Sequence, residues 1–176
     1  MGYTHYWSIK YGEEPADAFG RTLLDAKRIV DFAQSAGFEL SANGTVEDGD
    51  APVLAEGIIV LDGVEDESAG TFVFEGKAPP QNDYAWIWGA GIDGPGWAIG
   101  HVKTYRRAYD PVVCCILARA ALHYGDSIRV RSDGADEWDD ELQPWCTWLD
   151  AKALYLSVFG EDMPRPFTTA QMVEVA

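Results

Sequence analysis

Hydrophobic and polar positions along the 176-residue chain follow two periodicities, one typical of helices and one typical of strands. Over residues 16–36, apolar side chains recur every three or four positions, at Phe19, Leu23, Ala26, Val30 and Ala33. That spacing predicts an amphipathic helix with one apolar face. Gly37 follows the segment, and a glycine readily ends a helix in the left-handed conformation.

Two later segments also predict helices. Residues 112–124 are apolar almost all round, which indicates a buried helix, with Asp110 as its cap and Pro111 at its first position. Residues 144–159 predict a third helix, which Gly160 ends. We expect the tail after Glu161 to be irregular, because it carries two prolines.

Short apolar or alternating runs predict strands at residues 3–10, 57–63, 70–75, 84–88, 97–103 and 127–131. An acidic loop separates the second run from the third, which favours a hairpin. The glycine-rich stretch 89–96 precedes a strand, whereas a dinucleotide-binding glycine motif opens a helix, so we expect a flexible loop there. Together the elements predict one α+β domain over residues 1–176, with a mostly antiparallel sheet and two or three helices packed mainly on one face.

The charge is unusually negative, with 29 acidic against 13 basic residues, a net charge of -16 and a pI near 4.3. It argues against direct nucleic-acid binding and against adsorption to anionic membranes. Two interpretations stay open: solubility through self-repulsion, or an acidic surface that binds a protein partner. The second would suit a virion component or an inhibitor of a host nucleic-acid enzyme. No run of 18 apolar residues occurs, so we expect no membrane span.

The three cysteines, Cys114, Cys115 and Cys146, are odd in number and match neither a zinc motif nor a redox pair. We therefore predict no metal, no cofactor and no disulfide framework. This cysteine usage favours a reducing cytoplasm. The first residues also lack the layout of a signal peptide.

A basic and aromatic segment at residues 103–111 carries the main functional hypothesis. Lys103, Arg106 and Arg107 lie just ahead of the predicted helix, whose first N–H groups and positive dipole end favour anions. We expect a site for a small anionic or phosphorylated ligand, for instance a nucleotide signal. Thr104 and Tyr109 would add hydrogen bonds and Trp7 a stacking surface. Alternatively, Arg106 and Arg107 pair with the acidic loops and neutralise them.

An enzyme, most plausibly a hydrolase or transferase acting on such a ligand, is a further alternative. His5 and Asp133 are its candidate proton carriers, since a histidine titrates near neutral pH. Both residues also have structural interpretations, as a buried histidine and as a turn former. The same holds for His101, and a helix C-terminus accounts for His123.

Two motifs, Gly2-Tyr3-Thr4-His5-Tyr6-Trp7 and Lys103-Thr104-x-Arg106-Arg107-x-Tyr109-Asp110, resemble an uncharacterised family from bacteriophage and actinobacterial genomes. Its members begin GYTHYW and carry an F-N-G turn, a K-T-x-R-K-P-Y-D segment and an S-S-D-G turn. The resemblance spans most of residues 2–134. The chain departs at Leu61-Asp62-Gly63, at Ala108 and at Arg131, and matches at Asp133. It implies a phage or prophage origin, and with it a place in the host cytoplasm, but no mechanism.

Overall fold

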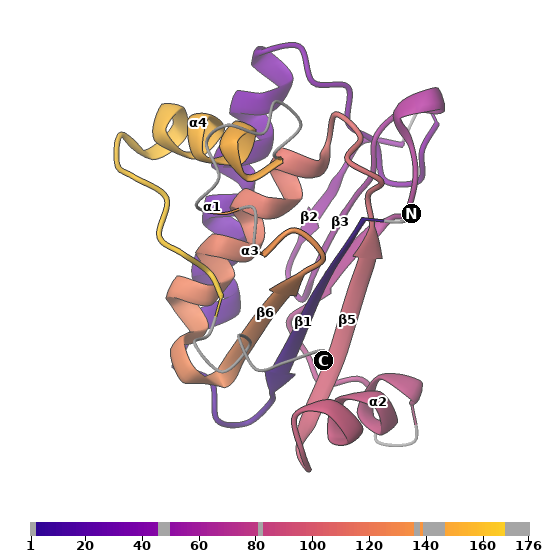
Figure 1. The fold of residues 1–176 in the computed structure, drawn as a ribbon, viewed down its shortest axis with the longest axis vertical. Helices are drawn as coiled ribbons and strands as arrows, with labels where there is room; N and C mark the ends of the chain where they lie inside the picture. Colours follow the sequence, from indigo (N-terminus) through magenta and orange to yellow (C-terminus); the bar gives the residue numbers. More distant parts are fainter. Residues whose placement is uncertain (1–2, 46–49, 81–82, 136–137, 139–146, 168–176) are drawn as a thin grey trace.

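The first strand of the chain occupies the centre of a three-stranded antiparallel sheet (Figure 1). The computed structural model describes residues 3–45, 50–80, 83–135, 138 and 147–167. The sheet has the order β5-β1-β6, with β1 (Thr4–Lys10), β5 (Trp97–Lys103) and β6 (Ile128–Ser132). All three strands were predicted from the sequence, and their bounds differ by a residue or so.

Successive side chains of β1 point to opposite faces of this sheet. Trp7 shares a buried face with Gly100 of β5 and Val130 of β6, which are its partners across the two ladders. Tyr6 points to the other face, opposite His101 and Arg131. The alternation of β1 therefore divides the molecule into a core side and a second, more open side.

A second antiparallel sheet, in the order β2-β3-β4, packs against the core side. Its strands are β2 (Val53–Ala55), β3 (Ile58–Leu61) and β4 (Phe72–Glu75), with a short 3₁₀ helix, η1 (Glu65–Glu67), between the last two. The rings of Phe72 and Phe74 lie 5.1 and 5.9 Å from that of Trp7. The predicted hairpin is confirmed, whereas the three-residue β2 was missed.

Three helices cover the core side of the first sheet (Figure 1). They are α1 (Ala18–Ser35), α3 (Asp110–Tyr124) and α4 (Thr147–Phe159). Most of α3 is buried, as its nearly continuous apolar sequence predicts. The predicted start of the third helix, at residues 144–146, lies outside the described residues. The α+β class is confirmed, with two small sheets rather than one.

The remaining helix, α2 (Tyr84–Ile92), corrects two predictions, a strand at residues 84–88 and a loop from residue 89. Asp83 caps it, because its carboxylate accepts a hydrogen bond from the Ala85 N–H at 2.9 Å. Gly89 lets the helix lie directly on β5, since a Cβ there would come within 2.2 Å of the Trp97 carbonyl oxygen. None of the helices in the described ranges is long and apolar enough to cross a membrane.

Candidate functional site

The segment between β5 and α3 turns sharply, and its backbone sends neighbouring side chains in different directions. Tyr105 and Arg106 adopt left-handed conformations, with φ of 51° and 60°. Each such residue costs roughly 1–2 kcal/mol when it is not glycine. Hydrogen bonds of 2.9 Å from the Arg107 N–H to the Thr104 carbonyl and from the Asp110 N–H to the Arg107 carbonyl close the turn.

The turn divides the basic segment between two hollows of the surface. Arg106 and Arg107 line a groove of about 530 Å³ between α1, α3 and α4. Lys103 instead lies along a hollow of about 480 Å³ on the open side of the sheet, together with Tyr6 and His101. The structure thus brings together two of the three predicted cations and separates the third.

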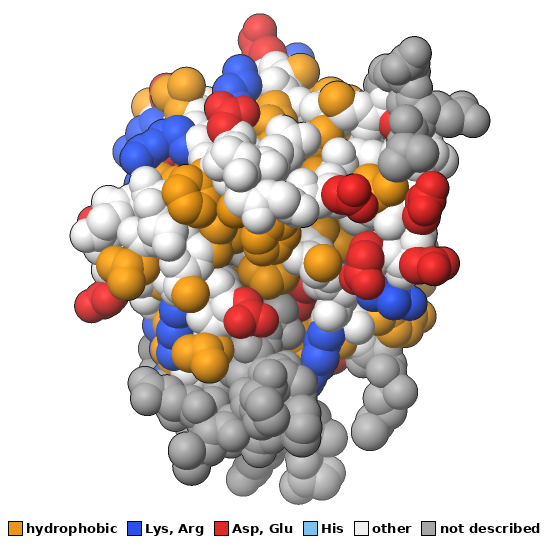
Figure 2. Space-filling view, turned by 90° about the horizontal axis from the view of Figure 1, so that it is seen from above, with side chains coloured by type: hydrophobic (Ala, Val, Ile, Leu, Met, Phe, Trp, Pro, Cys, Tyr) orange, Lys and Arg blue, Asp and Glu red, His pale blue; other side chains and the backbone are white. Residues whose placement is uncertain are grey.

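We call the first hollow the arginine groove. Its apolar lining comes from the end of α1, the start of α3 and one side of α4, and comprises Phe32, Ala36, Phe38, Ala108, Pro111, Ala153 and Leu154. Asp150 and Ser157 complete the polar lining. Figure 2 views this end of the molecule, where hydrophobic side chains gather in the middle and acidic ones mainly to one side.

The two arginines differ in how they are held. The Arg106 guanidinium lies 4.3 Å from the centroid of the Tyr3 ring, within cation–π range. Arg107 is exposed and forms no ion pair with any residue in the described part of the chain. The acidic helix η1 contacts the backbone of this segment and not the Arg107 guanidinium, because Glu67 accepts a hydrogen bond from the Ala108 N–H at 2.9 Å. Arg107 is therefore available to a ligand.

The other three predicted ligand contacts, Thr104, Tyr109 and Trp7, lie in the interior. The Tyr109 hydroxyl donates to the Gly70 carbonyl at 2.7 Å and accepts from the Gly70 N–H at 3.2 Å. Burial raises the pKa of this phenol above its ordinary value. Trp7 packs against the aromatic rings of Phe72 and Phe74 in the second sheet. These side chains hold the fold together and do not line the arginine groove.

The start of α3 differs from the anion-binding helix end expected from the sequence. Asp110 does not cap the helix: the capping position is Tyr109, without a side-chain cap, and the Asp110 carboxylate points to His5. The first backbone N–H groups already have acceptors, since Asp110 donates to Arg107 while Val112 and Val113 donate to Tyr109. An anion at this end would therefore be bound by side chains alone.

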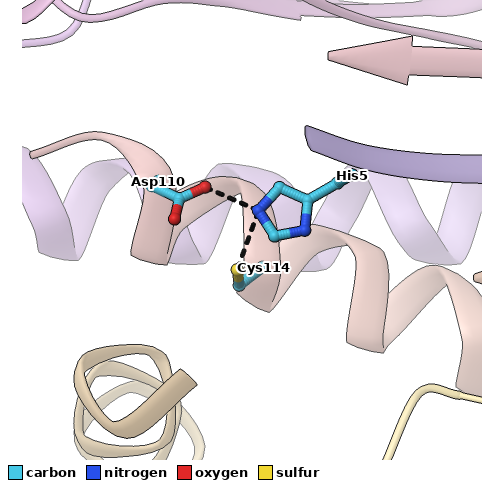
Figure 3. A group of neighbouring side chains, drawn as sticks. All are labelled: His5, Asp110 and Cys114. Carbon is cyan, nitrogen blue, oxygen red and sulfur yellow. Dashed lines mark hydrogen bonds and ion pairs between the residues drawn. The ribbon is translucent and has the colours of Figure 1, made fainter. Parts of the chain in front are cut away.

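Asp110 instead belongs to a buried cluster with His5 and Cys114 (Figure 3). Asp110 and Cys114 lie one turn apart on α3 and project toward the His5 ring on β1. His5 Nε2 lies 2.7 Å from Asp110 Oδ1 and 3.6 Å from Cys114 Sγ. All three side chains are fully buried.

Aromatic rings border the cluster. The rings of Tyr3 and Trp148 approach the His5 ring edge-on, at 5.2 and 5.5 Å between centroids. Two buried atoms of the cluster have no hydrogen-bond partner in the described part of the chain: His5 Nδ1 and Asp110 Oδ2. Such atoms are rare in folded proteins and call for an explanation.

The other candidate residues have structural roles. Asp133 Oδ2 accepts a hydrogen bond from the Thr4 N–H at 2.9 Å and fixes the start of β1. His101 stacks on Tyr6, with ring centroids 6.4 Å apart. His123 Nε2 contacts Asp25 Oδ2 at 2.6 Å. Neither His5 nor Asp133 lines the arginine groove or the hollow beside Lys103, so the predicted proton carriers and the predicted cations share no hollow.

Sequence reasoning missed the cluster because its members are remote in the chain. His5 and Asp110 are separated by 105 positions, and contacts at that distance leave no local spacing pattern. The available signal was an acidic residue four positions before a cysteine at the start of an apolar helix.

No protein-family model, curated protein or solved structure matches this chain.

Proposed function

We propose that the protein binds a small anionic ligand with an apolar body in the arginine groove. The supporting observation is a pair of arginines beside apolar walls, in a protein of net charge -16. One of them, Arg107, has no ion-pair partner among the described residues, although acidic residues greatly outnumber basic ones.

The chemistry of the lining defines the ligand class. A guanidinium presents a planar fork of N–H groups that matches a carboxylate or a phosphate. Phe32, Phe38 and Leu154 offer apolar contact for the rest of the molecule. Asp150 would repel a second negative group near it and would accept a hydrogen bond from a hydroxyl or an amine. The groove therefore suits a ligand with one anionic end, and its volume lies within the range of small-molecule sites.

Binding fits this lining better than acid–base catalysis does. Among the described residues, the groove contains one carboxylate, Asp150, and no histidine. His5 is enclosed in the core, and Asp133 is engaged with the backbone of β1. We accordingly place the hydrolase or transferase alternative second.

A thermal-shift screen tests the proposal. The panel contains nucleotides, cyclic nucleotides, phosphorylated metabolites and aromatic carboxylates. A ligand present at one hundred times its Kd adds about 2.7 kcal/mol to the stability of the folded state. For a chain of this length, that corresponds to a rise in Tm of roughly 5–10 °C.

Four variants locate the binding of any ligand found. Arg107→Ala should weaken it about 10- to 100-fold, because a charge-assisted hydrogen bond contributes about 1.5–3 kcal/mol. Ala153→Trp should abolish it, since the larger side chain would fill the groove at this exposed position. Lys27→Ala removes a charge from an exposed site on α1 outside the groove and should leave the Kd unchanged. Lys103→Ala reports on the second hollow.

The proposal fails if no ligand of the panel shifts the Tm. It fails equally if the affinity of a ligand falls in Lys103→Ala while Arg107→Ala and Ala153→Trp bind normally, because the site would then lie between β5 and α2.

A further inference from the structure

The buried cluster of His5, Asp110 and Cys114 combines three different metal-binding groups at one point. One ligand atom from each residue lies within 4.8 Å of the other two. An imidazole nitrogen, a carboxylate oxygen and a thiolate sulfur are the ligand types of zinc sites in proteins. Oxygen-only ions such as Mg²⁺ would not select a thiolate.

We propose that His5 Nε2, Asp110 and Cys114 Sγ bind a divalent transition-metal ion with the properties of Zn²⁺. The distances can be compared with tetrahedral coordination, using bond lengths of about 2.0–2.1 Å to nitrogen and oxygen and about 2.3 Å to sulfur. They require about 3.6 Å between nitrogen and sulfur, which equals the observed 3.6 Å from His5 to Cys114.

The separation of nitrogen and oxygen requires a small adjustment. Tetrahedral ligands would lie about 3.3 Å apart, whereas His5 Nε2 and Asp110 Oδ1 are 2.7 Å apart and share a proton in a hydrogen bond. In the metal-bound state the His5 ring keeps one proton, on Nδ1, while Asp110 is a carboxylate and Cys114 a thiolate. The thiol proton, and any proton of the His5–Asp110 pair beyond the one on Nδ1, leave to solvent. The carboxylate then has to move by about half an ångström, which a side-chain torsion supplies.

Burial and charge are consistent with the same ion. The side chains of His5, Asp110 and Cys114 are fully buried, and an unbalanced charge would be strongly disfavoured there. One carboxylate and one thiolate neutralise a divalent cation, with His5 contributing a neutral nitrogen. The site would therefore carry no net charge.

The unsatisfied polar atoms supply a second, independent observation. Asp110 Oδ2 has no hydrogen-bond partner in the described ranges and belongs to the coordinating carboxylate, so the ion can be bound through either oxygen of that group. An ion in the cluster would give this oxygen an interaction that the described residues do not supply.

The sequence provides a matched pair of variants. Cys114 and Cys115 are adjacent on α3 and both fully buried. Cys115 points elsewhere, because its sulfur donates to the Ala151 carbonyl at 3.3 Å. Cys114→Ser and Cys115→Ser therefore make the same chemical change at neighbouring buried positions, and only the first removes a proposed ligand. Cys146→Ser tests the third cysteine of the sequence.

The experiment measures bound metal in protein purified without chelators, by elemental analysis, and then titrates metal-stripped protein with Co²⁺. We expect about one equivalent of zinc and a cysteine-to-cobalt charge-transfer band in the near ultraviolet. Both should persist in Cys115→Ser and Cys146→Ser and disappear in Cys114→Ser. Chelation should lower the Tm of the wild type and leave that of Cys114→Ser unchanged, because a metal bound to the native state stabilises it.

Two results would overturn the proposal. Wild-type protein that contains no stoichiometric metal and gives no cobalt band means that the cluster is a hydrogen-bonded pair beside a thiol. A cobalt band that survives in Cys114→Ser but is lost in Cys115→Ser or Cys146→Ser assigns the metal to a different cysteine. Neither measurement on the wild type depends on whether a variant folds.

Discussion

Replacing Asp93 with asparagine should destabilise the protein by about 2 kcal/mol at neutral pH. Asp93 ends α2, and its side chain is only 1% exposed. Its Oδ1 accepts hydrogen bonds from Arg129, at 2.7 Å, and from Arg131, both on β6. Charge-assisted bonds contribute about 1.5–3 kcal/mol each. Because the arginines are 37% and 25% exposed, they regain water when the charge is removed, and the expected sum is correspondingly reduced.

The pH dependence identifies the charge as the cause. Burial alone would raise the pKa of Asp93, but hydrogen bonds from Arg131, Ser8 and Arg129 outweigh it and hold this pKa below its ordinary value. The unfolded chain therefore takes up the proton first as the pH falls. The stabilisation is fully present above the unfolded pKa of about 3.9 and is lost as the pH drops through the lower folded value.

The assay is urea unfolding followed by tryptophan fluorescence at several pH values. The free energies of unfolding of the wild type and Asp93→Asn should differ at pH 7 and converge toward pH 2. In thermal unfolding at neutral pH, their Tm values should differ by roughly 4–8 °C. Asp83→Asn is the control, because it makes the same change at the other end of α2 and asparagine caps a helix as well as aspartate does. Equal stabilities of the two variants, or a difference that persists at low pH, would refute the reasoning.

Three further variants test the packing of the interior. Gly100→Ala should destabilise the protein by about 1–3 kcal/mol, because the new Cβ would lie 2.3 Å from the Trp7 ring. Gly91→Ala, in an open part of α2, should stabilise it slightly. Thermal denaturation measures both variants, and equal effects would contradict the close approach of Gly100 to Trp7. Tyr109→Phe removes both hydrogen bonds to Gly70 and should cost about 1–3 kcal/mol, so an unchanged urea midpoint would show that water replaces the hydroxyl.

The parts of the fold that sequence reasoning predicted are those with a long, regular hydrophobic pattern. The 18 residues of α1 and the buried α3 belong to this group, as does β1. The helix α2 was missed because Tyr84, Trp86 and Trp88 alternate in the manner of a strand. Its true signals were the Asp83 cap and the contact between Gly89 and β5, and the second of these exists only in the folded state.

The site was predicted in part for a related reason. The sequence shows that Lys103, Arg106 and Arg107 are close in the chain. The direction of their side chains depends on the sign of φ at the residues between them, and a tyrosine or an arginine gives no reason to expect a positive φ. Left-handed φ values at Tyr105 and Arg106 separate Lys103 from the arginines. The apolar walls of the arginine groove come from three helices, so they could not be assembled from local patterns.

Because β1 lies at the centre of its sheet, the sheet can form only after β5 and β6 have been synthesised. β1 is made first, yet both of its neighbours, β5 and β6, are made much later. At translation rates of about 5–20 residues per second, roughly 4–17 s pass between the synthesis of β1 and that of β5. Until β5 is made, the segment of β1, which carries Tyr6, Trp7 and Ile9, has no partner for either of its edges. Production of the protein should therefore depend more on chaperones that shield nascent chains than its size would suggest.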